Sequence, residues 1–211
     1  MNISIILAHP NPGSFNHAIA AAAADALRQK GSVVWFHDLY AERFDPLLPI
    51  LELGHDPRLN ASLARHCREI AAADGIVIVH PNWWGMPPAI LKGWIDRVLR
   101  PEVAYRFVAN DQGEGVPQGL LKASAAVVFN TANTPEDRER EVFGDPLELL
   151  WKRCVFDLCG VRRVYRRTFS VVVTSTPQER SAWLEEARGI VCHSFPVSPR
   201  AGQPAPNLVN L

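Results

Sequence analysis

The chain has 211 residues, of which 47% are hydrophobic and 21% charged, a balance typical of a globular protein rather than a disordered or fibrous one. Its 22 basic and 22 acidic residues give zero formal net charge, so no whole-chain field would attract nucleic acid or an anionic membrane. No C-x-x-C pair occurs, and we expect buried, reduced thiols and no metal site at Cys67, Cys154, Cys159 and Cys192.

Short β-branched runs alternate with longer segments of helical period, a pattern that predicts parallel strands joined by crossover helices. The N-terminal apolar run is short and lacks a basic leader, so it indicates a strand and a cytoplasmic protein. No stretch approaches the roughly 18 apolar residues of a membrane span, so membrane insertion is not expected. The expected strands are 3–7, 33–36, 76–79, 125–129 and 171–173, the last with a start as early as residue 161.

Apolar residues recur at steps of three and four in the segments between these strands, as on one face of a helix. In the last such segment, Thr176, Pro177 and Glu179 supply a helix cap, a first-turn proline and a capping-box acid. The expected helices are 14–30, 59–72, 87–99 and 177–192.

These elements predict one α/β domain over residues 1–195, followed by an arm over 196–211 that is rich in Pro, Gly and Asn and extended or partly disordered. The expected architecture is a three-layer α/β/α sandwich with a five-stranded parallel sheet of order 2-1-3-4-5. Ligands of such sheets bind beyond the carboxyl ends of the strands at the switch point. The loops at that point are 8–16, 80–88 and 130–136.

The first of these loops runs directly into a helix whose opening N–H groups have no partner inside the helix. Ser14 and Asn16 add side-chain donors, and the helix dipole adds partial positive charge, so the loop suits a phosphate group. Simple capping by Ser14 explains the local sequence about as well. His9, at the strand end, is either a ligand-facing donor or a packed, hydrogen-bonded residue.

The second loop, His80 to Pro88, carries two adjacent tryptophans where the crevice is expected to open. Aromatic faces on a proline-stiffened loop provide an apolar wall for a planar conjugated ligand. The alternative is that Trp83 or Trp84 seals the core or a subunit contact.

The third loop is small and polar, and it continues into the acids Glu136 and Asp137. Its residues Thr131 to Thr134 could meet the polar edge of a ring system, although capping of a helix by Thr134 is the simpler alternative. A phosphate site beside a flat-ring site indicates a nucleotide-like cofactor, and flavin fits best because its ring needs both an aromatic wall and polar contacts.

At these positions the chain resembles the NAD(P)H:quinone oxidoreductase family of flavodoxin-like flavoproteins. The resemblance implies tightly bound FAD or FMN, a homodimer, and two-electron reduction of quinones by NADH or NADPH. It is carried over residues 3–135 by His9-Pro10, Ser14-Phe15-Asn16, Asp38-Leu39-Tyr40, Phe44-Asp45-Pro46, Ala73-Asp74, Pro81 through Trp84, Pro88 through Val98, and Ala104-Tyr105. The cofactor-binding residues that it implies are His9, Ser14, Phe15, Asn16, Pro81, Asn82, Trp83, Trp84, Gly85, Thr131, Ala132, Asn133 and Thr134.

The chain departs from the family in two places. Thr131 to Thr134 take the place of the family's Thr-Thr-Gly-Gly loop, and only Thr131 is identical to it. A tyrosine and a histidine that serve hydride transfer in diaphorase-like members are absent, and residues 135–145 form a segment of acidic and basic residues instead. The residues expected closest to the chemistry are Thr131 and Asn133, with Tyr105 either a pocket or a packing residue.

The sequence therefore predicts a ping-pong flavoenzyme that uses NAD(P)H to reduce a quinone-like acceptor. FAD is slightly favoured over FMN, because the loop over residues 46–60 and Arg180 could supply surface for an adenosine. The alternatives are an azo, nitro or flavin reductase of the same fold, and a flavin-binding regulatory subunit of a membrane transport system. A hydrolase built on Ser14 is a poor fourth, because the chain has no G-x-S-x-G elbow.

Overall fold

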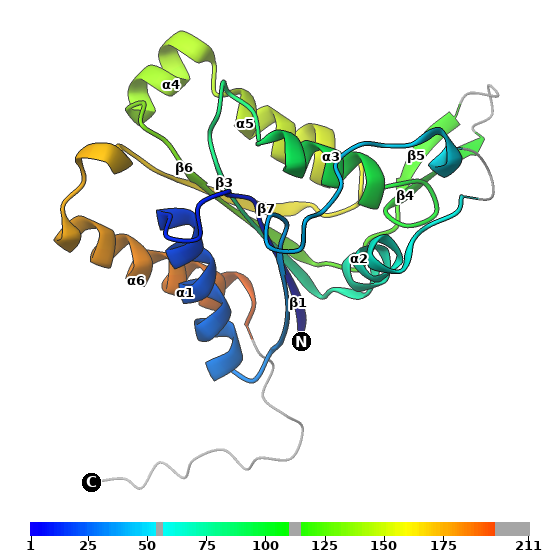
Figure 1. Ribbon diagram of the computed structural model, residues 1–211, viewed down its shortest axis with the longest axis horizontal. Helices are drawn as coiled ribbons and strands as arrows, with labels where there is room; N and C mark the ends of the chain where they lie inside the picture. Colours follow the sequence, from blue (N-terminus) through cyan, green and yellow to red (C-terminus); the bar gives the residue numbers. More distant parts are fainter. Residues whose placement is uncertain (54–56, 110–114, 197–211) are drawn as a thin grey trace, which may run out of the picture.

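The computed structural model describes residues 1–53, 57–109 and 115–196, so most of the expected C-terminal arm lies outside the described residues. A five-stranded parallel sheet of order β2-β1-β3-β6-β7 forms its centre, which confirms the predicted topology (Figure 1). The strands are β1 (Asn2–Leu7), β2 (Val33–Asp38), β3 (Gly75–Pro81), β6 (Ala125–Thr131) and β7 (Arg163–Phe169).

The three central strands are buried nearly throughout, as expected for continuous apolar runs that helices cover on both faces. Their register aligns Leu7 with Val79, and Pro81 with Thr131. The carboxyl ends of β1, β3 and β6 therefore meet at one edge, and the three loops singled out in the sequence converge there.

Helices cover both faces of the sheet (Figure 1). On one face lie α1 (Phe15–Gln29) and α6 (Pro177–Ser194), and α6 begins with the predicted capping box of Thr176 and Glu179. On the other lie α2 (Ala61–Ala72), α3 (Ala89–Val98), α5 (Pro146–Leu149) and the π-helical segment η2 (Leu150–Asp157). Helix α4 (Glu136–Phe143) projects beyond the carboxyl edge, and η1 (Ile50–Glu52) and η3 (Val172–Thr174) are single 3-10 turns.

The fifth strand lies within the range 161–173 that the sequence allowed, but it ends before the valine run 171–173 on which the expectation centred. Strand β7 comprises Arg163–Phe169, and the valine run after it leads into η3. An edge strand is covered on fewer sides, so it tolerates arginines, and here Arg166 pairs with Glu148 and Arg167 with Glu186. Centring the strand on residues 171–173 was wrong because it followed β-branched residues alone.

A two-stranded antiparallel ribbon, β4 (Tyr105–Ala109) and β5 (Gly115–Gly119), was not predicted. The prediction of four buried thiols also needs correction. Cys67 and Cys159 are buried, and burial raises the pKa of each thiol to about 11. Cys154 is exposed and Cys192 is half-buried. Among the helices of the described ranges, none has the length and apolar composition needed to cross a bilayer.

Candidate functional site

A cavity of about 360 Å³ opens at the carboxyl edge of the sheet, where the three loops meet. Its volume lies in the usual range for small-molecule sites. It is lined by His9, Ser14, Phe15, Asn16, Pro81, Asn82, Trp83, Thr131, Ala132, Asn133, Thr134, Val172 and Val173. The structure thus gathers eleven of the thirteen residues expected to bind a cofactor, and the other two, Trp84 and Gly85, line an adjoining cavity.

The N-terminus of α1 forms one end of the first cavity. Ser14 is the N-cap, and its hydroxyl accepts a bond of 3.4 Å from the backbone N–H of His17. The same hydroxyl lies 2.9 Å from Nδ1 of His17, whose Nε2 lies 3.0 Å from a carboxylate oxygen of Asp38. Ser14 is therefore the predicted helix cap, and it also borders the cavity in which a phosphate is expected. Its hydroxyl contacts a His17–Asp38 pair that the sequence interpretation missed.

His9 borders the same end of the cavity. Its Nδ1 accepts the backbone N–H of Asn11 at 3.1 Å, so in the neutral ring the proton resides on Nε2. Partial burial is the largest cause of the lowered pKa of His9. With its proton on Nε2, the ring can donate a hydrogen bond to a ligand in the cavity.

Two buried amide side chains test whether a flavin would fit. Asn16 donates to the hydroxyl oxygen of Thr131 at 2.9 Å, and Asn82 donates to a carboxylate oxygen of Glu139 at 2.8 Å. Within the described residues, the carbonyl oxygens of both amides are buried without a hydrogen-bond partner. Unsatisfied buried acceptors are costly, and both line the cavity, so they suit a ligand with hydroxyl or N–H donors, such as the ribityl chain and ring of a flavin.

The two tryptophans do not form a single wall. Trp83 and Met86 exchange backbone hydrogen bonds of 3.1 and 3.0 Å, which closes a tight turn with Trp84 and Gly85 at its tip. Both tip residues have positive φ, at 57° and 70°, an uncommon conformation for a bulky residue. Trp83 lines the first cavity, whereas Trp84 is fully exposed and borders the second.

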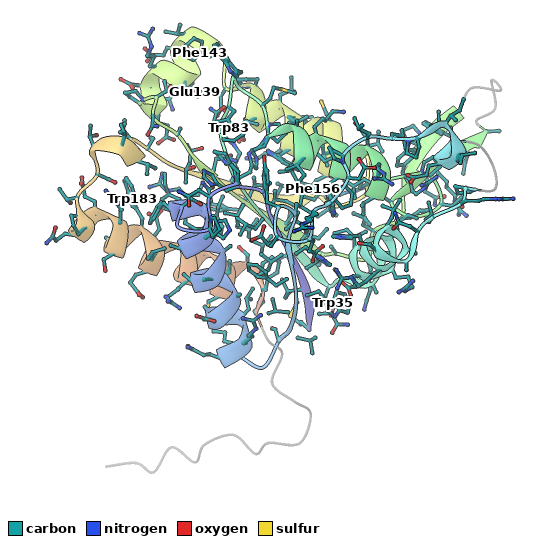
Figure 2. The ribbon with its side chains drawn as sticks, in the orientation of Figure 1. Trp35, Trp83, Glu139, Phe143, Phe156 and Trp183 are labelled. Atoms are coloured by element: carbon teal, nitrogen blue, oxygen red, sulfur yellow. The ribbon has the colours of Figure 1, made fainter. Side chains whose placement is uncertain are left out.

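The second cavity, of about 450 Å³, lies between this turn and α4. Figure 2 shows Glu139 and Phe143 on α4, beyond the end of the sheet near which Trp83 lies. Both residues belong to the segment 135–145, where the family's tyrosine and histidine are absent. No local sequence pattern had marked them as site residues. The cavity is lined by Asn82, Trp84, Gly85, Ala132, Asn133, Thr134, Glu139, Phe143 and Pro146.

Several expected contributions lie elsewhere. Tyr105 borders a separate hollow beside α3 and η2, outside both cavities of this chain. Thr134 does not cap α4, whose N-cap is Pro135 without a side-chain bond. Arg180 donates to the hydroxyl and carbonyl oxygens of Ser175 at 2.9 and 2.8 Å, so its guanidinium stabilises the turn before α6.

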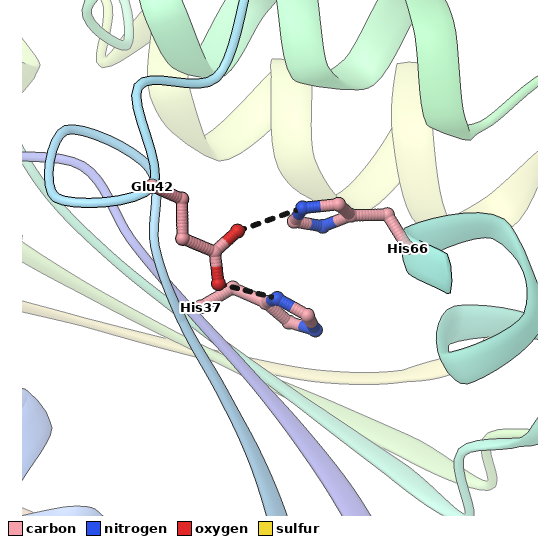
Figure 3. A group of neighbouring side chains, drawn as sticks. All are labelled: His37, Glu42 and His66. Atoms are coloured by element: carbon pink, nitrogen blue, oxygen red, sulfur yellow. Dashed lines mark hydrogen bonds and ion pairs between the residues drawn. The ribbon is translucent and has the colours of Figure 1, made fainter. Parts of the chain in front are cut away.

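A second polar cluster lies between the end of β2 and α2, where Glu42 bridges His37 and His66 (Figure 3). Burial opposes ionisation of Glu42, but hydrogen bonds from both histidines hold its pKa well below the usual range. A carboxylate oxygen of Glu69 lies 2.6 Å from Nε2 of His37, in a geometry that does not form a hydrogen bond.

The three bridging groups have the residue types of a metal site, and their ligand atoms lie within 4.8 Å of one another. However, Nδ1 of His66 accepts the indole N–H of Trp94 at 3.1 Å, so the proton of the ring lies on Nε2 and points at Glu42. A metal on Nε2 would move that proton to Nδ1, against the indole N–H. The cluster is therefore best described as a hydrogen-bonded junction of β2, its following loop and α2.

Comparison with known proteins places this geometry in a family. The model of the flavodoxin-like fold family matches residues 1–190. A Haemophilus influenzae protein named "Uncharacterized NAD(P)H oxidoreductase" is 35% identical over 194 residues, which cover 89% of this chain and 92% of that protein.

Solved structures of known proteins share the fold of this chain. The NAD(P)H:quinone oxidoreductase from Methanothermobacter marburgensis is 25% identical with a TM-score of 0.74, covering 90% of this chain and 95% of that one. The azoreductase AzrA, 15% identical with a TM-score of 0.72, covers 92% of this chain and 100% of its own, and shows the fold alone. The chain belongs to the flavodoxin-like fold family and, within it, to the NAD(P)H oxidoreductases.

Proposed function

We propose that this chain is a flavin-dependent NAD(P)H:quinone oxidoreductase that reduces quinones or similar acceptors by two electrons. The observation that carries the proposal is the first cavity, with N–H and hydroxyl donors around Ser14 and unpaired acceptor oxygens on Asn16 and Asn82. The donors around Ser14 suit an anionic phosphate. The acceptor oxygens of Asn16 and Asn82 suit the hydroxyl and N–H groups of a flavin. The quinone-reducing structural relative supports the same function.

A bound flavin would supply hydride uptake from NAD(P)H and hydride delivery to the acceptor. The residues of the chain bind and orient the reactants. Thr131 accepts the amide N–H of Asn16, so its own hydroxyl proton can still be donated. The carbonyl oxygen of Asn133 accepts the backbone N–H of Val173 at 2.9 Å, so its NH2 group also stays available. These two donors are the proposed groups that stabilise developing negative charge, an effect typically worth about 3 kcal/mol per donor.

The second cavity adjoins the first and is the proposed place for the uncharged nicotinamide ring of NAD(P)H and for the acceptor in turn, which implies ping-pong kinetics. Tyr105 lies outside both cavities of this chain, so its participation would require the homodimer that the family resemblance implies. Arg180 lines neither cavity, and neither do the described residues of the loop over residues 46–60, so the proposal covers FAD and FMN alike. The homodimer and a cytoplasmic location remain parts of this proposal.

The decisive experiment is an absorption spectrum of the purified protein with identification of any released chromophore, followed by anaerobic titration with NADH and NADPH. We expect one flavin per chain and bleaching of its absorption by one equivalent of reduced nicotinamide. Failure to bind either flavin after reconstitution would overturn the proposal.

Acceptor profiling distinguishes the other reductases. Turnover of azo or nitro compounds well above that of quinones would favour the azoreductase function, whose fold this chain shares. Very slow turnover of every acceptor, together with flavin-dependent association with a membrane protein, would favour the regulatory subunit. The Ser14–His17–Asp38 series has the order of a hydrolytic triad, so p-nitrophenyl ester hydrolysis abolished by Ser14→Ala would favour a hydrolase.

A further inference from the structure

The carboxylate of Glu139 is a charged group in the lining of the second cavity, the proposed substrate site. Its side chain comes from the first turn of α4, and the residue is only 9% exposed. Of the nine residues that line the second cavity, Glu139 is the only one that carries a charge. None of the thirteen residues that line the first cavity is acidic. The first cavity is therefore free of acids, whereas the second, which shares four lining residues with it, is anionic where α4 borders it.

The charge of Glu139 is held by an amide and not by a cation. Its one protein hydrogen bond among the described residues comes from Asn82, at 2.8 Å to Oε1. Neighbouring acids behave differently, because Asp145 and Glu148 both pair with Arg166. Within the described ranges, no lysine or arginine forms an ion pair with Glu139, and its second oxygen retains its capacity to accept hydrogen bonds.

The other charged groups of α4 do not cancel this charge inside the cavity. Arg138 stacks over the ring of Phe143, with its guanidinium carbon 5.8 Å from the ring centroid. All five other charged residues of α4 are exposed and line neither cavity, so solvent and salt screen them: Glu136, Asp137, Arg138, Arg140 and Glu141. A partly buried carboxylate is screened much less, and a like charge placed beside it is disfavoured.

We propose that Glu139 sets the charge selectivity of the second cavity, which accepts cationic or uncharged aromatic electron acceptors and rejects sulfonated or carboxylated ones. This inference rests on the proposed oxidoreductase function. Selectivity of this kind comes from a repulsive element and not only from attractive contacts. Glu139 is thereby a specificity-determining residue, with Asn82 as the residue that positions it.

The test compares three acceptors that share one ring: 1,4-naphthoquinone, its 2-sulfonate, and a trimethylammonium-substituted naphthoquinone. The ratio of kcat/KM for the sulfonate to that for the parent quinone is measured in the natural protein and in Glu139→Gln. Differences in intrinsic reactivity cancel in this comparison. We expect the ratio to rise about tenfold in Glu139→Gln, and the corresponding ratio for the cation to fall.

Glu141→Gln is the matched control, because it removes the same charge from an exposed position of the same helix. Its ratios should equal those of the natural protein. Equal changes in both variants would show a bulk charge effect and overturn the inference, as would unchanged ratios in Glu139→Gln.

A binding measurement keeps the test independent of turnover and of the variant's folding. Naphthalene-2-sulfonate and a naphthyl-trimethylammonium ion, both redox-inert, are titrated calorimetrically into the flavin-loaded natural protein at low salt. The cation should bind about tenfold more tightly, and the difference should shrink with salt. Equal affinities would overturn the inference, whereas a protein that retains no flavin and reduces no acceptor would instead refute the proposed function.

Discussion

The indole N–H of Trp151, on η2, donates to Nε2 of His80 at 3.0 Å, directly beneath the tryptophan-containing loop. The amide of Asn130 lies 2.8 Å from the same nitrogen, and Nδ1 of His80 lies 2.8 Å from the carbonyl oxygen of Pro81. His80 is therefore neutral, with its proton on Nδ1, and it fixes the backbone from which Asn82 reaches the site. Burial lowers the pKa of His80 to about 4.

Stability should therefore depend on pH through His80. Its pKa is about 4 in the folded state against an ordinary value of 6.5 for histidine, so the unfolded chain binds the proton first as pH falls. The contribution is complete above about pH 6.5 and is lost down to pH 4, with an upper value of about 3 kcal/mol. In urea unfolding measured across this range, His80→Gln should show a shallower loss of stability than the natural protein.

The control is His193→Gln, which removes an exposed histidine near the end of α6. It should leave the slope unchanged. Parallel pH profiles for His80→Gln and the natural protein would show that His80 already carries a proton in the folded state.

Phosphate binding should depend on the side chain of His17. Its Nδ1 lies 2.9 Å from the hydroxyl of Ser14 and its Nε2 lies 3.0 Å from a carboxylate oxygen of Asp38, so the ring holds the hydroxyl that borders the proposed phosphate site. His17→Gln should therefore weaken FMN binding, as measured by calorimetric titration.

Riboflavin lacks the phosphate, so its affinity should be nearly the same in His17→Gln and in the natural protein. Equal losses of affinity for FMN and riboflavin would contradict a role of His17 at the phosphate.

The Glu42 junction should stabilise the fold without metal. Glu42→Gln removes an ionised acceptor for His37 and His66, so we expect a loss of about 2 kcal/mol at pH 7. Because the folded pKa of Glu42 is depressed, that loss should shrink as pH falls below about 4.5. Thermal unfolding with and without Zn²⁺ should coincide, and exposed Glu185→Gln should behave as the natural protein. A large zinc-dependent rise in Tm would contradict the tautomer assigned to His66.

The sequence predicted the strands correctly where burial on both faces requires a run of apolar residues. Strands β1 and β3 are covered on both faces, and their runs of Ile and Val identify them without any tertiary information. Strand β7 lies at the edge, and Arg166 and Arg167 are tolerated there only because acids from other elements meet them. Such partners are not visible in a local window, so the pattern favoured the valines that follow.

The sequence predicted those site residues that lie at the carboxyl ends of strands or in the loops that follow them. Ser14 ends the loop that follows β1, and Thr131 is the last residue of β6, so topology alone brings them to one edge. Glu139 joins the site through a hydrogen bond to Asn82, 57 positions away in the chain, and His17 through Asp38, 21 positions away. Pairings at such separations depend on how helices sit on the sheet, which no spacing rule encodes.

The close approach of α3 to the loop after β2 provides a last prediction. A Cβ on Gly93 would lie 2.2 Å from the carbonyl oxygen of Pro46 and 2.5 Å from its Cα, and backbone cannot yield as a flexible side chain does. Gly93→Ala should therefore cost about 2 kcal/mol in urea unfolding, despite the helix propensity of alanine. Gly189, on the exposed side of α6, meets nothing within 4 Å, so Gly189→Ala should instead stabilise the protein by about 0.5–1 kcal/mol. A Gly93→Ala variant that is as stable as the natural protein, or more stable, would show that the loop at Pro46 does not pack against α3 in solution.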